Sequence, residues 1–353
     1  MYTPDMSKNQ PKFDVAEFMK NATVTERPLP SGNEDTFQPT DSSKPAETSE
    51  NKPLNGEALK KAALVAIIGR PSAGKSTFLN TASGEKISIV SPVPQTTRNA
   101  VRGIVNTSFG QLVFIDTPGY HDSEKKLNLL LQSVTADQLK DADAVLYIID
   151  STREPGEEEL KTAELVSSAA EKTVIAINKI DARDSRPAKA RDFIKNALPT
   201  VPENRIFEMS AEKDENINDV LKALYELAPV AEPMYPEEFY TDQEVDFRIA
   251  EIIREKAINL LHDEIPHAIY IDIADMEWRK NGKVLWVRAF LVVERESQKG
   301  IVIGKGASMI KQIRLESLKT MQDIFDYKID LDLQVKVNKN WRQKSPLLSK
   351  LIH

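Results

Sequence analysis

The sequence predicts an α/β domain built on a mostly parallel, doubly wound sheet, followed by a smaller α+β domain. Two observations support this prediction. Short aliphatic runs alternate with amphipathic stretches from residue 63 onward, and a proline-containing break then precedes a set of elements in a different order. A length of 353 residues is also too great for one typical hydrophobic core, which favours two domains.

The apolar runs of the first domain have the character of strands that are buried on both faces of a parallel sheet. They span residues 63–69, 111–116, 144–150 and 173–178. Amphipathic stretches with helical periodicity lie between or after them, at residues 127–139, 157–168 and 217–228. This alternation of strand and helix indicates the doubly wound fold.

The second domain follows a stretch from Pro229 to Asp242 in which periodicity is lost. Its elements are a helix, two strands, a glycine-containing turn with a helix, and a strand, at 247–261, 269–276, 284–293, 308–325 and 328–337. The predicted boundaries are a disordered extension at 1–58, the first domain at 61–229, a linker at 230–245, the second domain at 246–340 and a C-terminal tail at 341–353.

The amino-acid composition favours a cytoplasmic protein with a disordered N-terminal extension. The N-terminal extension is rich in Pro, Ser, Thr, Asn and Glu, and such a segment cannot repay the entropy of ordering. The chain has no apolar run near the roughly 18 residues of a membrane helix, and we expect no secretory signal. With zero cysteines and a net charge of −7, we expect a cytoplasmic protein in which any nucleic-acid site is a local patch.

A phosphate-binding loop is predicted between the first strand and the helix that follows it. The segment from Gly69 to Ser76 fits the pattern G-x-x-x-x-G-K-[ST] in the context that the mechanism requires. Glycine lets the backbone N–H groups face phosphate, Lys75 supplies a cation, and the Ser76 hydroxyl can ligate Mg²⁺. The predicted nucleotide-binding residues of this loop are Gly69, Arg70, Pro71, Ser72, Ala73, Gly74, Lys75, Ser76 and Thr77.

The base is predicted to be guanine. Asn178, Lys179 and Asp181 follow the last of these apolar runs in the pattern N-K-x-D. The Asp181 carboxylate can accept hydrogen bonds from N1–H and the 2-amino group of guanine, a donor pair that adenine lacks, so GTP is favoured over ATP. The other predicted base-binding residues are Ser210, Ala211, whose N–H can reach the guanine oxygen, and Glu212.

Two further segments are predicted to meet the metal and the γ-phosphate. Asp116 ends a strand and can hold Mg²⁺ through water, while the N–H of Gly119 can contact the γ-phosphate. Thr96 and Thr97 lie in an aperiodic stretch between residues 87 and 101, which suits a segment ordered by metal and phosphate. Spacing alone does not decide which threonine reaches the metal.

From Ala63 to the C-terminus the chain resembles the Era family of bacterial GTPases. The most specific matches are QTTR at 95–98, PEEFYTDQ at 236–243, AEIIREK at 250–256, VERESQKG at 293–300 and VKVNKNW at 335–341. The resemblance implies a P-loop GTPase domain and a type II KH domain that recognises the 3′ end of small-subunit ribosomal RNA. It further implies a role in assembly of the 30S subunit and a loose association with the inner membrane, and we expect a monomer.

The resemblance also favours Thr97 over Thr96 as a metal ligand. The predicted catalytic residues are then Lys75, Thr97 and Gly119, and the predicted Mg²⁺ ligands are Ser76, Thr97 and Asp116. Ser72 stands where Era-like loops usually carry an asparagine that helps bind K⁺ in related GTPases, which weakens the case for K⁺ as a cofactor. Tyr120 replaces the water-orienting glutamine of Ras-like enzymes, so we expect slow intrinsic hydrolysis that RNA or ribosome contact accelerates.

The predicted RNA-binding turn lies between residues 303 and 311. KH domains carry a G-x-x-G turn between two helices, which lets the backbone approach RNA phosphates. Here Ala307, not glycine, occupies the fourth place of the turn. A close approach of the backbone to RNA then requires a negative φ at Ala307 or a turn shifted by one residue. Residues 295–344 hold 11 Lys or Arg and 6 Asp or Glu, about +5 in a protein of net −7. The predicted RNA-binding residues are Lys299, Gly304, Lys305, Gly306, Ala307, Lys311 and Arg314.

Some conspicuous side chains have a structural interpretation. Trp341 is expected to be a partly buried anchor rather than a base-stacking platform, and Trp286 a core residue. The run Glu157–Glu159 is expected to be a charge cluster at a helix start.

The leading functional hypothesis is a GTPase switch whose nucleotide state sets its affinity for RNA. The alternative is an RNA-binding assembly chaperone that binds GTP with little hydrolysis, which the absent glutamine and Ser72 suggest. A small-molecule kinase would share the phosphate loop, but Asn178 and Asp181 argue against it.

Overall fold

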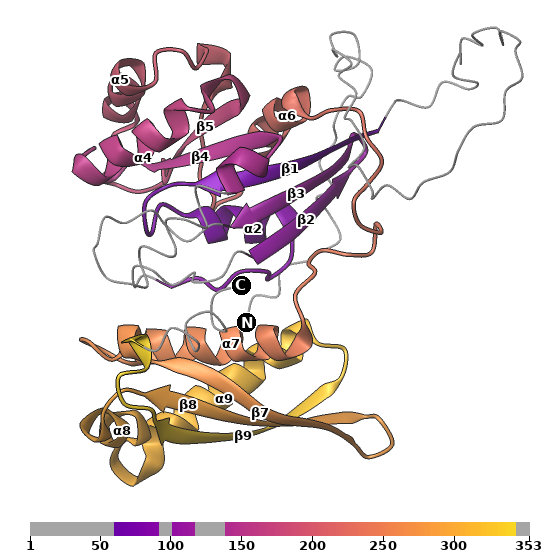
Figure 1. The fold of residues 1–353 in the computed structure, drawn as a ribbon, viewed down its shortest axis with the longest axis vertical. Coiled ribbons are helices and arrows are strands. Elements are labelled where there is room, and N and C mark those ends of the chain that lie inside the picture. Colours follow the sequence, from indigo (N-terminus) through magenta and orange to yellow (C-terminus); the bar gives the residue numbers. More distant parts are fainter. Residues whose placement is uncertain (1–59, 92–100, 117–137, 344–353) are drawn as a thin grey trace, which may run out of the picture.

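The computed structural model describes residues 60–91, 101–116 and 138–343. Several predictions lie outside the described residues: the extension at 1–58, most of the helix at 127–139, Thr96, Thr97, Gly119, Tyr120 and the tail beyond residue 343. The described chain forms two units, and Figure 1 shows the second domain lying against the first.

A six-stranded sheet forms the first domain, in the order β2-β3-β1-β4-β5-β6. Strand β2 is antiparallel to β3, and the other neighbouring pairs are parallel. The bounds are β1 Lys61–Ile68, β2 Val101–Thr107, β3 Gly110–Asp116, β4 Ala144–Asp150, β5 Thr173–Asn178 and β6 Ile206–Glu208. The predicted doubly wound, mostly parallel sheet is therefore confirmed. Strand β2 is an addition, because the sequence analysis placed no strand between residues 101 and 110.

Helices cover both faces of this sheet (Figure 1). Their bounds are α2 Lys75–Ser83, α4 Glu157–Ser167, α5 Pro187–Ala197 and α6 Ile217–Leu227. Alternate residues of a strand point to opposite faces, so Val65 of β1 packs in one core with α2 and α6, while Ala66 packs in the other with α4 and α5. The sequence predicts α4 and α6 but not α5.

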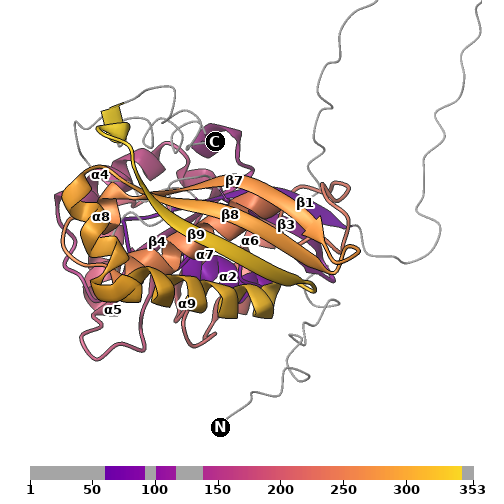
Figure 2. The same cartoon turned by 90° about the horizontal axis from the view of Figure 1, so that it is seen from below.

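The second domain has the element order α-β-β-α-α-β. Its bounds are α7 Val245–Leu260, β7 Tyr270–Arg279, β8 Val284–Val293, α8 Glu296–Ile303, α9 Ser308–Ile324 and β9 Lys328–Val337. Strand β8 is central, antiparallel to β7 and parallel to β9. Figure 1 shows α7 next to the first domain, and Figure 2, seen from below, shows the sheet in front of α7, with its other face turned away from the first domain. This is the predicted α+β unit, with α8 as an unpredicted extra helix.

Short 3₁₀ turns complete the described secondary structure. They are Ala170–Lys172, Glu203–Arg205, Pro266–Ala268, Lys305–Ala307 and Trp341–Gln343.

The segment between the domains runs along the edge strand β2. The side-chain amide of Gln111 donates to the carbonyl of Tyr235 (2.8 Å) and accepts from the N–H of Tyr235 (2.9 Å). Farther along, the N–H of Ile104 donates to the carbonyl of Tyr240 (2.9 Å), and the Thr241 hydroxyl donates to the carbonyl of Arg102 (2.8 Å). These bonds fix most of the predicted linker to the first domain.

The two tryptophans that the sequence singles out behave differently. Trp341 is 1% exposed, and its Nε1–H donates to the carbonyl of Ala268 (3.0 Å), so it is the predicted anchor and is fully buried. The prediction that Trp286 is a core residue is wrong. It lies half-buried on the open face of the sheet, where the guanidinium groups of Arg279 and Arg288 lie 4.0 and 4.9 Å from its ring centroid.

Candidate nucleotide site and RNA-binding face

The phosphate loop connects β1 to α2, and two of its glycines are required by geometry. Gly74 has φ of +99°, and a Cβ there would lie 2.2 Å from Nδ2 of Asn178. Gly69 has φ of +156°, and a Cβ there would lie 2.4 Å from the carbonyl oxygen of Ile148. Because any side chain at either position collides with a neighbouring strand end, the loop can close only with glycine.

Lys75 begins α2 and is 5% exposed. Its ammonium donates to the carbonyls of Gly69 (3.0 Å) and Arg70 (3.1 Å), which belong to the loop itself. Burial lowers the pKa of Lys75 to about 8, and the carboxylates of Asp116 and Glu159 oppose that shift. A buried ammonium at the N-terminus of a helix is arranged to meet an anion, as the prediction for Lys75 requires.

Asp116 ends β3 and is fully buried. The Ser76 hydroxyl donates to its Oδ2 (2.6 Å), whereas Oδ1 has no hydrogen bond within the described part of the chain. Burial raises the pKa of Asp116, while Lys75 and the hydroxyls of Ser76 and Ser88 lower it. The Ser88 hydroxyl makes no hydrogen bond within the described residues, and its influence on the pKa of Asp116 is the smallest of these. A buried carboxylate oxygen without a partner, beside a serine hydroxyl, fits a hard cation such as Mg²⁺.

Arg70 does not direct its side chain toward the phosphate position. It is 4% exposed, and its Nη1 lies 3.1 Å from Oε2 of Glu159 in α4. Glu159 is 2% exposed and also accepts from the hydroxyl of Tyr147 (2.5 Å). The run Glu157–Glu159 lies in the first turn of α4, as predicted, and Glu159 in addition ties α4 to the phosphate loop. Only the backbone of Arg70 lines the loop.

Asn178 joins the phosphate loop to the predicted base site. Its Nδ2 donates to the carbonyl of Ala73 (2.8 Å), and its Oδ1 accepts from the N–H of Ala211 (2.9 Å). In the structure this N–H is bonded to Asn178, and its contact with the guanine oxygen stays a prediction. Sequence motifs cannot reveal the bond to Asn178, because it joins residues that lie 33 apart along the chain.

Asp181 is exposed at the predicted base site, and its Oδ1 accepts from the Ser210 hydroxyl (2.7 Å). The neighbouring Lys179 has φ of +66° and pairs with the buried carboxylate of Asp150 (2.7 Å). The exposed Glu212 pairs with the adjacent Lys213 at 3.5 Å. Asp181 is thus held in place by one hydroxyl and remains accessible to a base.

Two residues of the phosphate loop have less defined roles. Ser72 is exposed and left-handed, with φ of +63°, a conformation that asparagine adopts more readily than serine. Thr77 is half-buried in the first turn of α2.

The predicted RNA-binding turn connects α8 to α9. Gly304 has φ of +74°, and a Cβ there would lie 2.8 Å from the backbone nitrogen of Met309. Gly306 and Ala307 both have φ of +60°. Of the two alternatives that the sequence left open, Ala307 therefore does not adopt the negative φ. It holds the left-handed conformation that glycine would take without strain, at a cost of about 1–2 kcal/mol.

The predicted RNA-binding side chains differ in solvent exposure and in their contacts with the rest of the domain. Lys305 and Lys311 are exposed, and Lys299 is half-buried. The Nε–H of Arg314 donates to the carbonyl of Leu331, and the guanidinium lies 3.6 Å from Asp330, so this side chain is held against β9. Two exposed aliphatic residues, Ile301 (56%) in α8 and Leu315 (52%) in α9, were not predicted as surface residues, because an exposed aliphatic side chain looks like a core residue in sequence.

Taken together, the glycine-bounded loop, the buried lysine and aspartate, and the exposed Asp181 define a GTP-binding protein of the P-loop class, followed by an α-β-β-α-α-β domain. Comparison with family models agrees. A model described as 50S ribosome-binding GTPase matches residues 64–179, and one described as KH domain matches residues 264–342.

Curated relatives are more specific. GTPase Era of Treponema denticola is 60% identical over 288 residues, covering 82% of this chain and 98% of the relative. GTPase Era of Treponema pallidum is 45% identical over 305 residues, covering 81% and 96%. The chain belongs to the Era family of GTPases.

Two solved structures share the fold over most of the chain, at 31% identity and with coverage of 82% of this chain and 98% of each neighbour. One is an Aquifex aeolicus Era variant bound to GDP and AlF4⁻, with a TM-score of 0.77. The other is Era in complex with MgGDPNP and nucleotides 1506–1542 of 16S ribosomal RNA, with a TM-score of 0.78. No described helix is long and apolar enough to cross a membrane.

Proposed function

We propose that this GTPase binds the 3′ end of small-subunit ribosomal RNA through its KH domain and acts in assembly of the 30S subunit, with the bound nucleotide setting RNA affinity. One observation carries the proposal: a guanine-type nucleotide site and a KH turn with exposed lysines lie on one chain. The RNA bound in the Era neighbour supports the choice of partner. The family description that names the 50S subunit makes the large subunit the natural competitor in a binding test.

The roles we propose for individual residues follow the geometry of the site. Lys75 binds the terminal phosphates, Ser76 and Asp116 hold Mg²⁺, and Asp181 selects guanine. Asn178 acts indirectly by joining the phosphate loop to the Ala211 turn. Thr97 and Gly119 remain proposals from the sequence alone. We also retain the predicted domain boundaries, a monomeric state, and a cytoplasmic protein with peripheral attachment to the inner membrane.

The test measures binding of a 16S 3′-end RNA to the full chain with GDP and with a non-hydrolysable GTP analogue. We expect the two complexes to differ in RNA affinity by about tenfold. The Asp181→Asn variant serves as the nucleotide control, because it should lose guanine preference without touching the KH turn. Equal RNA affinity in both complexes, or a preference for 23S over 16S RNA, would contradict the proposal.

A second candidate function is an assembly chaperone that binds GTP but scarcely hydrolyses it. Ser72 favours this alternative, because it replaces the asparagine expected at a left-handed loop position. Single-turnover GTP cleavage with and without ribosomal RNA separates the two functions. We expect slow cleavage that RNA accelerates, whereas a chaperone would show no acceleration.

A further inference from the structure

The segment Lys86–Val90 is held by the helix that starts at the phosphate loop. Oδ1 of Asn80, in α2, accepts from the N–H groups of Ile87 (2.9 Å) and Ser88 (2.8 Å). Its Nδ2 donates to the carbonyl of Ser88 (2.8 Å). Ser88 is itself 2% exposed and is one of the two hydroxyls beside Asp116. Since α2 begins with Lys75 of the phosphate loop, Asn80 connects this segment to the nucleotide site.

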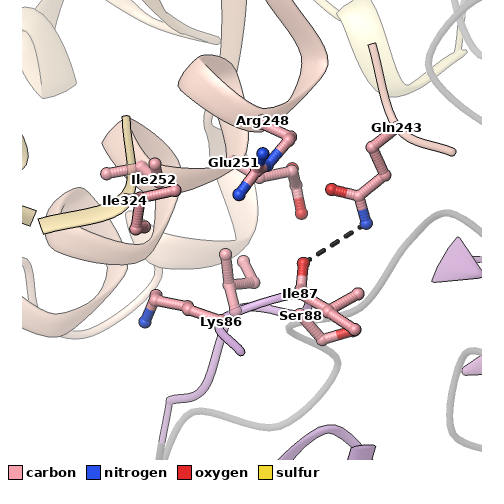
Figure 3. A pocket seen from close by; sticks show the side chains of 9 residues that line it. Lys86, Ile87, Ser88, Gln243, Arg248, Glu251, Ile252 and Ile324 are labelled. Carbon is pink, nitrogen blue, oxygen red and sulfur yellow. Dashed lines mark hydrogen bonds between the residues drawn. The ribbon is translucent and has the colours of Figure 1, made fainter. Parts of the chain in front are cut away.

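The same segment is held from the other side by the KH domain. Glu255 of α7 is 4% exposed, and its Oε1 accepts from Nζ of Lys86 (2.7 Å) and from the N–H of Val90 (3.3 Å). Gln243, just before α7, donates from Nε2 to the carbonyl of Ile87 (3.2 Å). Figure 3 shows this last bond at a pocket between the segment and α7. Two domains thus bind one stretch of five residues.

Glu255 has few alternatives to this contact. Its Oε2 is buried without a hydrogen bond in the described chain, and the adjacent Lys256 lies 3.5 Å away. A buried carboxylate that loses its partners is strongly destabilised. Loss of the bonds to Lys86 and Val90 would leave Glu255 with Lys256 alone, which favours an exposed carboxylate once α7 has moved. A contact with two such arrangements can transmit a change between sites.

We propose that Glu255 is a positioning residue of the nucleotide site that the KH domain supplies, and that its bonds to Lys86 and Val90 couple nucleotide occupancy to RNA binding. The inference rests on the proposed function, since it assigns the coupling to particular atoms. In the arrangement seen here Glu255 holds α7 against the segment. Binding of metal and triphosphate at the phosphate loop shifts α2, Asn80 carries this shift to the segment Lys86–Val90, and α7 is released. By thermodynamic linkage, RNA that favours the released arrangement strengthens binding of the GTP form by the same factor.

The experiment uses the full chain and a 16S RNA fragment equivalent to nucleotides 1506–1542. RNA dissociation constants are measured with GDP and with a non-hydrolysable GTP analogue. In the wild type we expect RNA to bind the analogue complex about tenfold more tightly. In Glu255→Gln the GDP complex gains RNA affinity and the ratio falls to about two, because loss of the charge weakens the bond that holds α7. Lys86→Gln removes the partner from the GTPase side and is expected to have the same effect.

Glu251→Gln is the matched control. Glu251 also lies on α7 and lines the same pocket, but it pairs within the helix with Arg254 (2.6 Å). This variant is expected to keep the wild-type ratio.

A second readout follows the domains directly. The chain has no cysteine, so labels can be placed through Lys195→Cys and Lys319→Cys, both exposed. In the GDP form, Glu255→Gln is expected to shift the distance distribution toward that of the analogue form. A residue that merely stabilises the fold would not produce this shift.

The outcomes are distinguishable. If the wild type binds RNA equally in both nucleotide states, the coupling in the proposed function is wrong and this inference falls with it. If the wild type shows the ratio and both Glu255→Gln and Lys86→Gln keep it, only the assignment to Glu255 is overturned. If Glu251→Gln lowers the ratio equally, the effect belongs to the charge of α7 and the assignment also fails.

Discussion

Replacing Ala307 by glycine should stabilise the KH domain. The left-handed conformation, with φ of +60°, costs alanine about 1–2 kcal/mol. Glycine relieves that strain but loses about 0.5–1 kcal/mol more conformational entropy on folding. The expected net gain in the free energy of unfolding is about 0.5–1 kcal/mol. Most Ala→Gly changes have the opposite sign, so the direction alone tests the geometry of the turn.

The assay is urea unfolding followed by tryptophan fluorescence. The chain has three tryptophans, Trp278, Trp286 and Trp341, and all of them lie in the second domain or just after it. The signal therefore reports that domain alone. With a slope of about 1–2 kcal/mol per molar for a small domain, the midpoint should rise by about 0.5 M.

A matched change supplies the control. Ala250 lies inside α7 with ordinary helical geometry, and Ala250→Gly is expected to lower the free energy of unfolding by about 1 kcal/mol. If Ala307→Gly also lowers the midpoint, the left-handed assignment of Ala307 is refuted.

Three further predictions concern the nucleotide site. Gly74→Ala should weaken GDP binding by at least about 100-fold, because its Cβ would lie 2.2 Å from Asn178, whereas Gly156→Ala meets no neighbour within 4 Å, has a negative φ and should bind normally in calorimetry. The pKa of Lys75 falls from 10.5 to about 8 on folding, so the unfolded chain holds more protons between those values and the stability of the nucleotide-free protein should rise across that pH window. Lys75→Met should abolish that rise in urea unfolding between pH 7.5 and 9.5, and equal pH slopes would contradict the assignment. Asp116→Asn should reduce GDP affinity about tenfold with Mg²⁺ present and leave affinity in EDTA unchanged; a loss that is equal in both conditions would argue against a metal role.

The sequence predicted the buried strands of both domains best. Strands β4 and β5 consist of apolar runs whose ends are marked by Asp150 and Asn178, and the observed bounds agree with the prediction. Strand β2 was missed because its exposed residues, such as Arg102, interrupt the apolar pattern. Helix α8 was missed because Gly300 lies within it, and glycine in sequence signals a turn.

The site was predictable as a set of positions but not as a set of contacts. Spacing located Lys75, Asp116 and Asp181, because each follows a strand whose end meets the same edge of the sheet. It could not show that Arg70 turns toward Glu159, or that Ala211 is bonded to Asn178. These contacts depend on the packing of elements far apart in the chain, which local patterns do not encode.

The bonds between the linker and β2 limit how far the KH domain can travel. A free chain of about 16 residues would give a tether with a typical reach of roughly 20 Å. Here Asp242 pairs with Arg102 of β2 (3.0 Å), Gln243 donates to the carbonyl of Ile87 (3.2 Å), and α7 begins at Val245. Only Glu244 is left between the last anchored residue and α7, so the second domain can tilt about its first turn while its centre stays near the nucleotide site.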